Sequence, residues 1–292
     1  MLLEQKLEQV KLSSAQNEVV HYLLKMRDHI KDMTVKEIAE ATYTSTGTVI
    51  RLTKKLGYNG YEDFKNDFLK EIYYLDTHFQ NINPNIPFDR EDNIQKIASK
   101  ITMLAQETME DTLSLIDHDS LQKATWLLKN AKHIHLAAIS YSLFYGQIFR
   151  LDMARIGKQV NVCDVSGEEL FLPAVVSNED VVIIISYSGQ IEKLCTLAKM
   201  LKKMKVSIIV ITSLGDNELK KYADVVLSIS TREKLYSKIK GYSNENSIKL
   251  ILDILYSCYF AIDYEKNLKR KIEVSKNGEI GRISSLEVMK ED

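Results

Sequence analysis

Two short serine-containing segments carry the side chains best suited to binding an anionic small molecule. Each follows a run of apolar residues and precedes a stretch with helical periodicity, so backbone N–H groups and the positive end of a helix dipole would face the same space. Hydroxyl groups add neutral hydrogen-bond donors, and together these groups could hold a phosphate without a lysine. The candidate ligand-binding residues are Ser140 and Ser142 in the first segment and Ser186, Ser188, Gly189 and Gln190 in the second.

The same serines have a plainer interpretation, because serine is a common N-cap residue and could simply open the helices that follow. One such segment alone would favour capping. Two segments at the ends of neighbouring strands favour a binding site instead, since ligands of open α/β sheets bind beyond the carboxyl ends of strands, where the strand order reverses.

A segment near residue 50 has the start and stop signals of two short helices. Thr34 and Glu37 have capping-box spacing, and small residues follow in the helix that they would open. Ser45 can cap a second helix that continues to Leu56, with Gly57 placed to stop it. Two short helices joined by a tight turn are typical of a helix-turn-helix, whose second helix enters the major groove of DNA.

The second predicted helix carries side chains that suit contact with DNA. Small residues at its leading end can approach base edges or phosphates, an arginine can pair with guanine or phosphate, and lysines can bind phosphates. Val49, Leu52 and Leu56 are expected to form its packing side. The candidate DNA-binding residues on its other faces are Ser45, Thr46, Gly47, Thr48, Arg51, Lys54 and Lys55.

Overall charge does not identify the ligand of this helix. The chain has 39 Lys and Arg against 40 Asp and Glu, a formal net charge of -1, so the field of the whole molecule does not attract DNA or a membrane. Residues 45–61 nevertheless contain three basic residues and no acidic residue. Spacing and charge support equally a DNA-binding element and a dimerisation or packing module with a solvated basic face.

The hydrophobic pattern divides the chain into two parts. Helical periodicity extends through the first part, whereas the second alternates β-branched apolar runs with amphipathic helices. This alternation predicts a doubly wound, five-stranded parallel α/β sheet in flavodoxin-like order, preceded by an N-terminal all-α domain. The predicted strands are 133–139, 159–163, 181–185, 207–211 and 225–229. The predicted organisation is a helix-turn-helix domain over 1–77, a linker and connecting helix over 78–121, a sheet domain over 122–264 and a charged tail over 265–292.

Composition and missing motifs exclude several classes of protein. Three widely separated cysteines argue against a disulfide framework and for a reducing cytoplasm, and no apolar run is long enough to span a bilayer. The sequence lacks a Walker loop, a zinc-protease motif and a nucleophile elbow, and neither a metal nor another cofactor is predicted.

A sugar isomerase would need a base such as Glu168, Glu169 or His135. His135 is expected to pack inside a strand, and Glu168 and Glu169 could either approach the ligand pocket or begin a helix as first-turn acids. Catalysis is not predicted.

Residues 45–65 resemble the N-terminal domain of the RpiR family of bacterial transcriptional regulators. That family has a Ser-x-x-Thr-Val-x-Arg recognition helix followed by Lys-Leu-Gly, an aromatic residue, glycine, a second aromatic residue and lysine. This chain has the same order from Ser45 to Lys65. The resemblance implies that the second helix reads DNA and that a first helix near residues 13–26 braces the pair.

Residues 185–190, Ile-Ser-Tyr-Ser-Gly-Gln, look like the central signature of the sugar isomerase (SIS) domain, and the resemblance covers about residues 122–263. It implies that Ser186 and Ser188, with the first-segment serines, hold the phosphate of a phosphosugar. The chain departs from the family pattern where Ala138 and Ser140 occupy glycine positions and where Ile191 replaces a threonine. Added β-carbons restrict φ at such positions, so the sequence is compatible with an altered phosphosugar or with a degenerate site.

These features predict a cytoplasmic bacterial regulator of carbohydrate metabolism that binds duplex operator DNA and whose phosphosugar effector modulates that binding. A homodimer or larger even homo-oligomer is expected, because two recognition helices about 34 Å apart match successive turns of the major groove. No membrane partner is expected. A sugar-phosphate isomerase with a helical assembly domain is the alternative, and a regulator that has lost its ligand is a third possibility.

Overall fold

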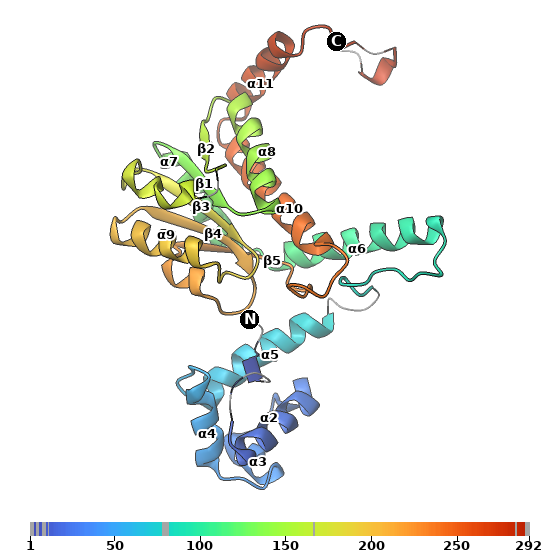
Figure 1. The fold of residues 1–292 in the computed structure, drawn as a ribbon, viewed down its shortest axis with the longest axis vertical. Helices are drawn as coiled ribbons and strands as arrows, with labels where there is room; N and C mark the ends of the chain where they lie inside the picture. Colours follow the sequence, from blue (N-terminus) through green and yellow to red (C-terminus); the bar gives the residue numbers. More distant parts are fainter. Residues whose placement is uncertain are drawn as a thin grey trace. The chain divides into compact units, whose positions relative to one another are not determined.

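The structure is a computed structural model (Figure 1) that describes residues 3, 6, 7, 10, 12–77, 82–165, 167–283 and 285–289, with only the backbone of 73–77. The described chain forms two compact units. The first contains the chain up to Glu107 with Leu214–Asp216 and Arg232–Lys240, and the second contains Thr108–Ser213, Asn217–Thr231 and the chain from Gly241 onward. Residues 78–81, where the sequence predicts the start of the linker, lie outside the described residues.

Helices build the N-terminal unit around an apolar core. They are α2 (Ser14–Met26), the 3-10 helix η1 (Arg27–Ile30), α3 (Val35–Ala41), α4 (Thr46–Lys55), α5 (Tyr61–Thr77) and the first part of α6 (Ile94–Ser114). Apolar residues from α2 to α5 meet in one cluster that includes Leu23, Ile38, Leu52, Phe64 and Phe68, each fully buried. This core fixes α3 and α4, which form the predicted helix-turn-helix.

A five-stranded parallel sheet forms the centre of the second unit. Its strands are β1 (Ile134–Ala138), β2 (Val160–Val162), β3 (Val181–Ser186), β4 (Ser207–Ser213) and β5 (Val225–Ile229). Their order is β2-β1-β3-β4-β5, and all neighbouring strands pair in parallel. β3 is buried along its whole length, as expected when both faces of a sheet are covered. The prediction of a doubly wound sheet in flavodoxin-like order is confirmed.

Helices cover the two faces of this sheet (Figure 1). One face packs against α7 (His118–Asn130), α8 (Tyr141–Arg155) and α10 (Tyr242–Ile262), and the other against α9 (Glu192–Lys203) and the 3-10 helix η4 (Glu218–Tyr222). Successive residues of β3 alternate between the two cores, as in Ile183 and Ile184. The connection from β2 to β3 is different, because its described residues contain only the short 3-10 helices η2 (Glu168–Leu170) and η3 (Leu172–Ala174).

Paired hydroxyl groups join the end of α6 to the start of α10. Thr108 Oγ1 donates to Ser243 Oγ at 2.9 Å, and the hydroxyl oxygens of Thr112 and Ser247 are 2.7 Å apart. All four side chains are buried. The last two turns of α6 are therefore part of the sheet domain's polar interior.

The charged C-terminal segment contains a helix that the sequence analysis did not predict. α11 (Tyr264–Gly278) follows α10 after Asp263, whose φ of -130° and ψ of 56° are not helical. Asn267 is buried, and its Nδ2 donates to the carbonyl of Phe260 at 2.9 Å, which fixes the angle between the two helices. The 3-10 helix η5 (Glu287–Met289) lies further along the chain. In the part of the chain described above, no helix is long and apolar enough to cross a membrane.

Candidate DNA-binding helix and ligand-binding loops

The capping box that opens α3 is formed as the sequence predicts. The backbone N–H of Thr34 donates to the Glu37 carboxylate at 2.7 Å, and the N–H of Glu37 donates to Thr34 Oγ1 at 3.3 Å. These hydrogen bonds from Thr34 to the carboxylate hold the pKa of Glu37 below its usual value. Glu37 is thus ionised at neutral pH and stabilises the first turn of α3.

α4 begins at a second predicted cap and ends as expected. Ser45 Oγ accepts the backbone N–H of Thr48 at 3.2 Å, and Gly57, just beyond the helix, has a φ of +97°. In the turn between α3 and α4, Tyr43 has a φ of +51°, which closes the turn tightly. Both helices of the motif therefore start and stop where the sequence analysis places them.

The exposed side of α4 carries most of the predicted DNA-binding residues. The exposed ones are Ser45, Thr46, Arg51, Lys54 and Lys55, and Gly47 is half-buried. Val49, Leu52 and Leu56 are buried in the core. A β-carbon on Gly47 would lie 3.3 Å from a guanidinium nitrogen of Arg51, so the glycine leaves room for the arginine beside the leading end of the helix.

Thr48 differs from the prediction that it lies on an outward face. Its side chain is only 9% exposed, its hydroxyl oxygen is 3.0 Å from Ser45 Oγ, and it accepts a hydrogen bond from Arg51 Nη2 at 3.4 Å. Thr48 therefore links the cap of α4 to Arg51.

The first serine loop keeps a glycine-like backbone although it lacks the glycine. Ser140 has a φ of 60° and a ψ of -135°, and it lies at the N-cap position of α8 without a capping hydrogen bond from its side chain. A left-handed φ is unfavourable for any residue with a β-carbon. The Ser140 side chain is exposed and that of Ser142 is half-buried.

The second serine loop is held by hydrogen bonds within the loop and by packing against Asn217. Ser186 is the last residue of β3 and is buried, and its Oγ accepts the N–H of Gly189 at 3.2 Å. Ser188 Oγ accepts the N–H of Gln190 at 3.3 Å. Gly189 is buried against Asn217 and has a φ of +61°. These hydrogen bonds close the loop on itself.

The register of the sheet brings the two loops to the same edge. Ala138 of β1 pairs with Ile185 of β3, so the loops leave adjacent strands at the same level. The residue at the N-cap of α9 is Ile191, which has no side-chain capping bond. Neither serine loop therefore caps its following helix through a side chain.

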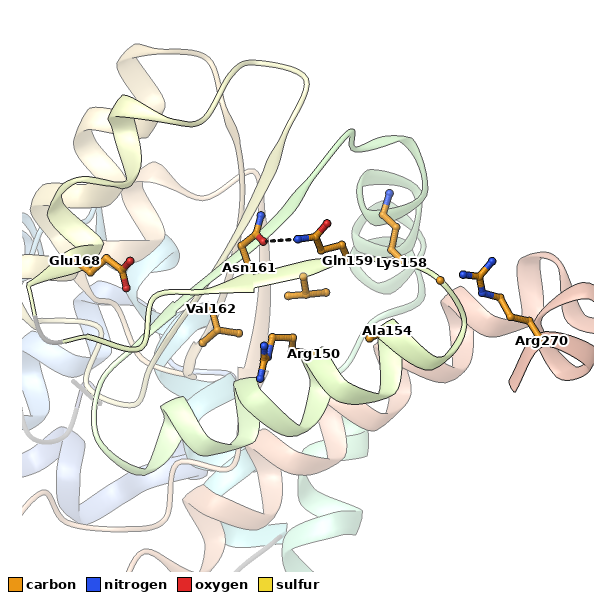
Figure 2. Close-up of a pocket in the computed structure, with 10 residues that line it drawn as sticks. Arg150, Ala154, Lys158, Gln159, Asn161, Val162, Glu168 and Arg270 are labelled. Atoms are coloured by element: carbon orange, nitrogen blue, oxygen red, sulfur yellow. Dashed lines mark hydrogen bonds between the residues drawn. The ribbon is translucent and has the colours of Figure 1, made fainter. Parts of the chain in front are cut away.

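A basic pocket lies elsewhere in the second unit and was not predicted. This cavity of about 590 Å³ is lined by Arg150, Lys158, Arg270 and Glu168, among others (Figure 2). The guanidinium of Arg270, on α11, packs directly against Gly157, whose φ is +84°, and a β-carbon there would displace it. The cavity is formed by α8, β2 and α11, three elements with no shared sequence motif.

A second cavity, which we call the histidine pocket, has a volume of about 380 Å³. It is lined by His133, His135, Asn161, Val162, Cys163, Glu168, Phe171, Leu172 and Val175. None of the predicted ligand-binding residues lines either of these two cavities.

Comparison with known protein families identifies both parts of the chain. Residues 1–73 match the helix-turn-helix domain of the rpiR family, and residues 127–262 match the SIS domain. The chain is an RpiR-type regulator. The resemblance found in the sequence is thus confirmed for both halves.

Relatives of this RpiR-type regulator match it along most of their length. An uncharacterized helix-turn-helix transcriptional regulator of Clostridium perfringens is 28% identical over 278 residues, which cover 94% of this chain and 97% of that protein. A similar regulator of Thermotoga maritima is 28% identical and covers 86% of this chain and 88% of its own. The structure of Vibrio vulnificus NanR complexed with ManNAc-6P has the same fold, with a TM-score of 0.61, 20% identity, and coverage of 96% of this chain and 100% of NanR.

The residues weighed as catalytic bases are a buried histidine and two glutamates that accept backbone N–H groups in this RpiR-type regulator. His135 is buried in β1, as predicted. Glu169 is buried and accepts the N–H of Gly167 at 2.8 Å, and Glu168 accepts the N–H of Val165 at 3.4 Å. Both glutamates thus stabilise the start of η2. The helix-turn-helix match and the relatives named as transcriptional regulators agree with the prediction that the chain is a transcriptional regulator and not an enzyme.

Proposed function

We propose that this regulator binds operator DNA through α4, and that a phosphorylated sugar bound at the two serine loops alters its affinity for the operator. The regulator would act in carbohydrate metabolism in the bacterial cytoplasm. The observation that carries the proposal is the exposed basic side of α4, which presents Arg51, Lys54 and Lys55. The opposite side of this helix is buried in the apolar core.

Three features of α4 support DNA binding. Small residues at its leading end leave space for base edges, and Arg51 is held beside that end by Thr48. Lys54 and Lys55 lie in the last turn of the helix, where they can reach phosphates. We assign residues 1–77 to the DNA-binding domain, 78–121 to a linker and connecting helix, 122–264 to the effector domain and 265–292 to the C-terminal tail.

Effector binding is supported by the loops after β1 and β3. They share one edge of the sheet, Ser140 has the backbone of the glycine that it replaces, and their serines do not cap helices. We assign phosphate binding to Ser140, Ser142, Ser186 and Ser188 with the backbone of Gly189 and Gln190. The NanR complex with ManNAc-6P supports a phosphorylated sugar as the class of effector.

A homodimer or larger even homo-oligomer would present two copies of α4 to successive turns of the major groove, which are about 34 Å apart. Effector and DNA would then be coupled through the relative placement of the two copies. This coupling is reciprocal by thermodynamic necessity, so operator DNA changes effector affinity by the same factor.

DNA binding is tested with fragments selected from a random library by the wild-type protein. Arg51→Ala is expected to weaken binding by roughly 10- to 100-fold, and Lys54→Ala to reduce the salt dependence by about one phosphate contact. Lys129→Ala, which removes an exposed lysine of α7, is the matched control and should bind normally. Full affinity of Arg51→Ala for the selected fragments would refute the role of α4.

Effector binding is tested by thermal shift with a panel of phosphosugars that includes ManNAc-6P. We expect one of them to stabilise the wild-type protein and the Ser186→Ala, Ser188→Ala double variant to lose that stabilisation. Ser257→Ala, an exposed serine of α10, is the control and should respond as the wild type does. Equal stabilisation of the double variant would remove these serines from the site.

A further inference from the structure

We propose that the histidine pocket is a second ligand site, which binds a small uncharged molecule with an apolar body and one hydroxyl group. The proposal is independent of operator binding and of the phosphosugar loops. It rests on how the pocket is formed, on the state of His135 and on the chemistry of the walls.

The pocket exists because one connection of the sheet lacks an α-helix. In doubly wound sheets, helices normally cover both faces. Between β2 and β3 the described residues form only η2 and η3, each three residues long. The face of the sheet over β1 and β2 is therefore left partly uncovered, and the space there is the histidine pocket.

His135 is a buried residue of this pocket whose ring nitrogens lack hydrogen-bond partners among the described residues. Its side chain lines the pocket and is only 5% exposed, yet neither ring nitrogen has a hydrogen-bond partner among the described residues. An unpaired polar group in a protein interior is costly, and most such groups are paired. A ligand that hydrogen-bonds this imidazole would remove the cost.

The ring nitrogens of the two histidines determine which group they can bind. Burial lowers the pKa of His135, so its ring is neutral at pH 7 and offers one N–H donor and one bare nitrogen acceptor. His133 Nδ1 lies 3.0 Å from a carboxylate oxygen of the buried Asp180, which fixes that ring and leaves Nε2 for the pocket. A hydroxyl group, which can both donate and accept, complements these rings.

The remaining walls favour an apolar and uncharged body. Val162, Cys163 and Leu172 line the interior, and Phe171 and Val175 stand at the rim, 75% and 74% exposed. Burial raises the pKa of the Cys163 thiol to about 11, so this side chain is a neutral apolar contact. The carboxylates of Glu168 in the wall and Asp180 behind His133 oppose an anionic ligand.

This site differs from the phosphosugar loops in position and chemistry. His135 lies three residues before Ala138, about 10 Å back along the strand from the edge that carries the serines. The serine loops offer hydroxyl and N–H donors to an anion, whereas the histidine pocket offers imidazole nitrogens between mainly apolar walls. The two sites can therefore be occupied separately.

The test uses phenol as the probe and benzoate as its charged counterpart of similar size, with the full chain labelled with ¹³C in its histidine rings. We expect phenol at millimolar concentration to shift the ring signals of His133 and His135 in a saturable manner and to leave His118, exposed on α7, unchanged. Benzoate is expected to bind at least tenfold more weakly. The absence of a saturable shift with phenol, or tighter binding of benzoate, would overturn the proposal.

Two variants locate the binding. His135→Phe keeps an aromatic ring but removes both nitrogens, and it should weaken phenol binding about tenfold when followed through His133. Val175→Trp fills the rim without altering the buried core and should block phenol while the His135 signal remains that of a folded protein. His118→Phe is the matched control and should bind phenol as the wild type does. Unaltered phenol affinity in His135→Phe or in Val175→Trp would contradict the assignment.

Discussion

Replacement of Gly189 by alanine should strongly destabilise the sheet domain. Gly189 has a φ of +61°, and a β-carbon there would lie 2.1 Å from both Cγ and Oδ1 of Asn217. Asn217 is only 2% exposed, so its side chain cannot swing into solvent without breaking its own contacts. Its Nδ2 donates to Thr212 Oγ1 at 3.1 Å, and its Oδ1 accepts the N–H of Lys220 at 3.3 Å.

The magnitude follows from two separate costs. A left-handed residue with a β-carbon costs roughly 1–2 kcal/mol, and a buried polar group that loses its partner costs about 1–3 kcal/mol. We therefore expect Gly189→Ala to lower the free energy of unfolding by about 3 kcal/mol. Gly167→Ala separates the two costs, because Gly167 has a φ of +96° but no described atom within 4 Å of its added β-carbon. This control should lose only about 1–2 kcal/mol.

Urea denaturation followed by the fluorescence of Trp126 measures both variants, since this residue is the chain's one tryptophan and lies on α7 of the same unit. In an Asn217→Ala background the collision is absent, so Gly189→Ala should then cost no more than Gly167→Ala does. If Gly189→Ala and Gly167→Ala are equally destabilising in the wild-type background, Asn217 does not restrict the loop and the reasoning is refuted.

Three further changes test other parts of the structure. Ser140→Gly should relieve the left-handed backbone and raise the free energy of unfolding by about 1 kcal/mol in the same denaturation assay; a loss of stability would mean that the hydroxyl holds the loop. Thr34→Ala removes the cap of α3 and should cost about 1 kcal/mol, visible as faster amide hydrogen exchange in that helix, and unchanged exchange would argue against the cap. Burial lowers the pKa of His135 in the folded state below its usual value of 6.5, so on acidification the unfolded chain binds a proton at this ring before the folded chain does. The free energy of unfolding should therefore fall below about pH 6.5, by at most about 1.4 kcal/mol per pH unit. The free energy of unfolding of His135→Phe should fall less over this pH range than that of the wild type. Parallel pH profiles for the variant and the wild type would contradict the role of His135.

The sequence was sufficient for the parts of the fold that depend on local signals. The strands of the sheet are nearly continuous Val and Ile runs, and such runs are typical of parallel strands buried on both faces. The helix-turn-helix was predictable because Thr34, Ser45 and Gly57 mark its ends with capping and stop residues. These signals lie within a few residues of the structure that they specify.

Features that depend on tertiary contacts could not be predicted. Thr48 looks like an outward hydroxyl by type, but it lies beside Val49 and Leu52 on the packed side of α4. α11 is rich in charge with few apolar residues, and its position depends on single contacts such as Asn267 to Phe260 and Arg270 over Gly157. The cavity walls combine side chains from several strands, helices and loops, such as Arg270 of α11 with residues 150–168 in the basic pocket, so no motif marks them.

The hydroxyl pairs between α6 and α10 have a mechanical consequence. They hold Thr108 and Thr112, in the last two turns of α6, against Ser243 and Ser247 at the start of α10. Because all four hydroxyl groups are buried, water does not compete for these hydrogen bonds. A displacement of the first turns of α10 therefore carries the last two turns of α6 with it.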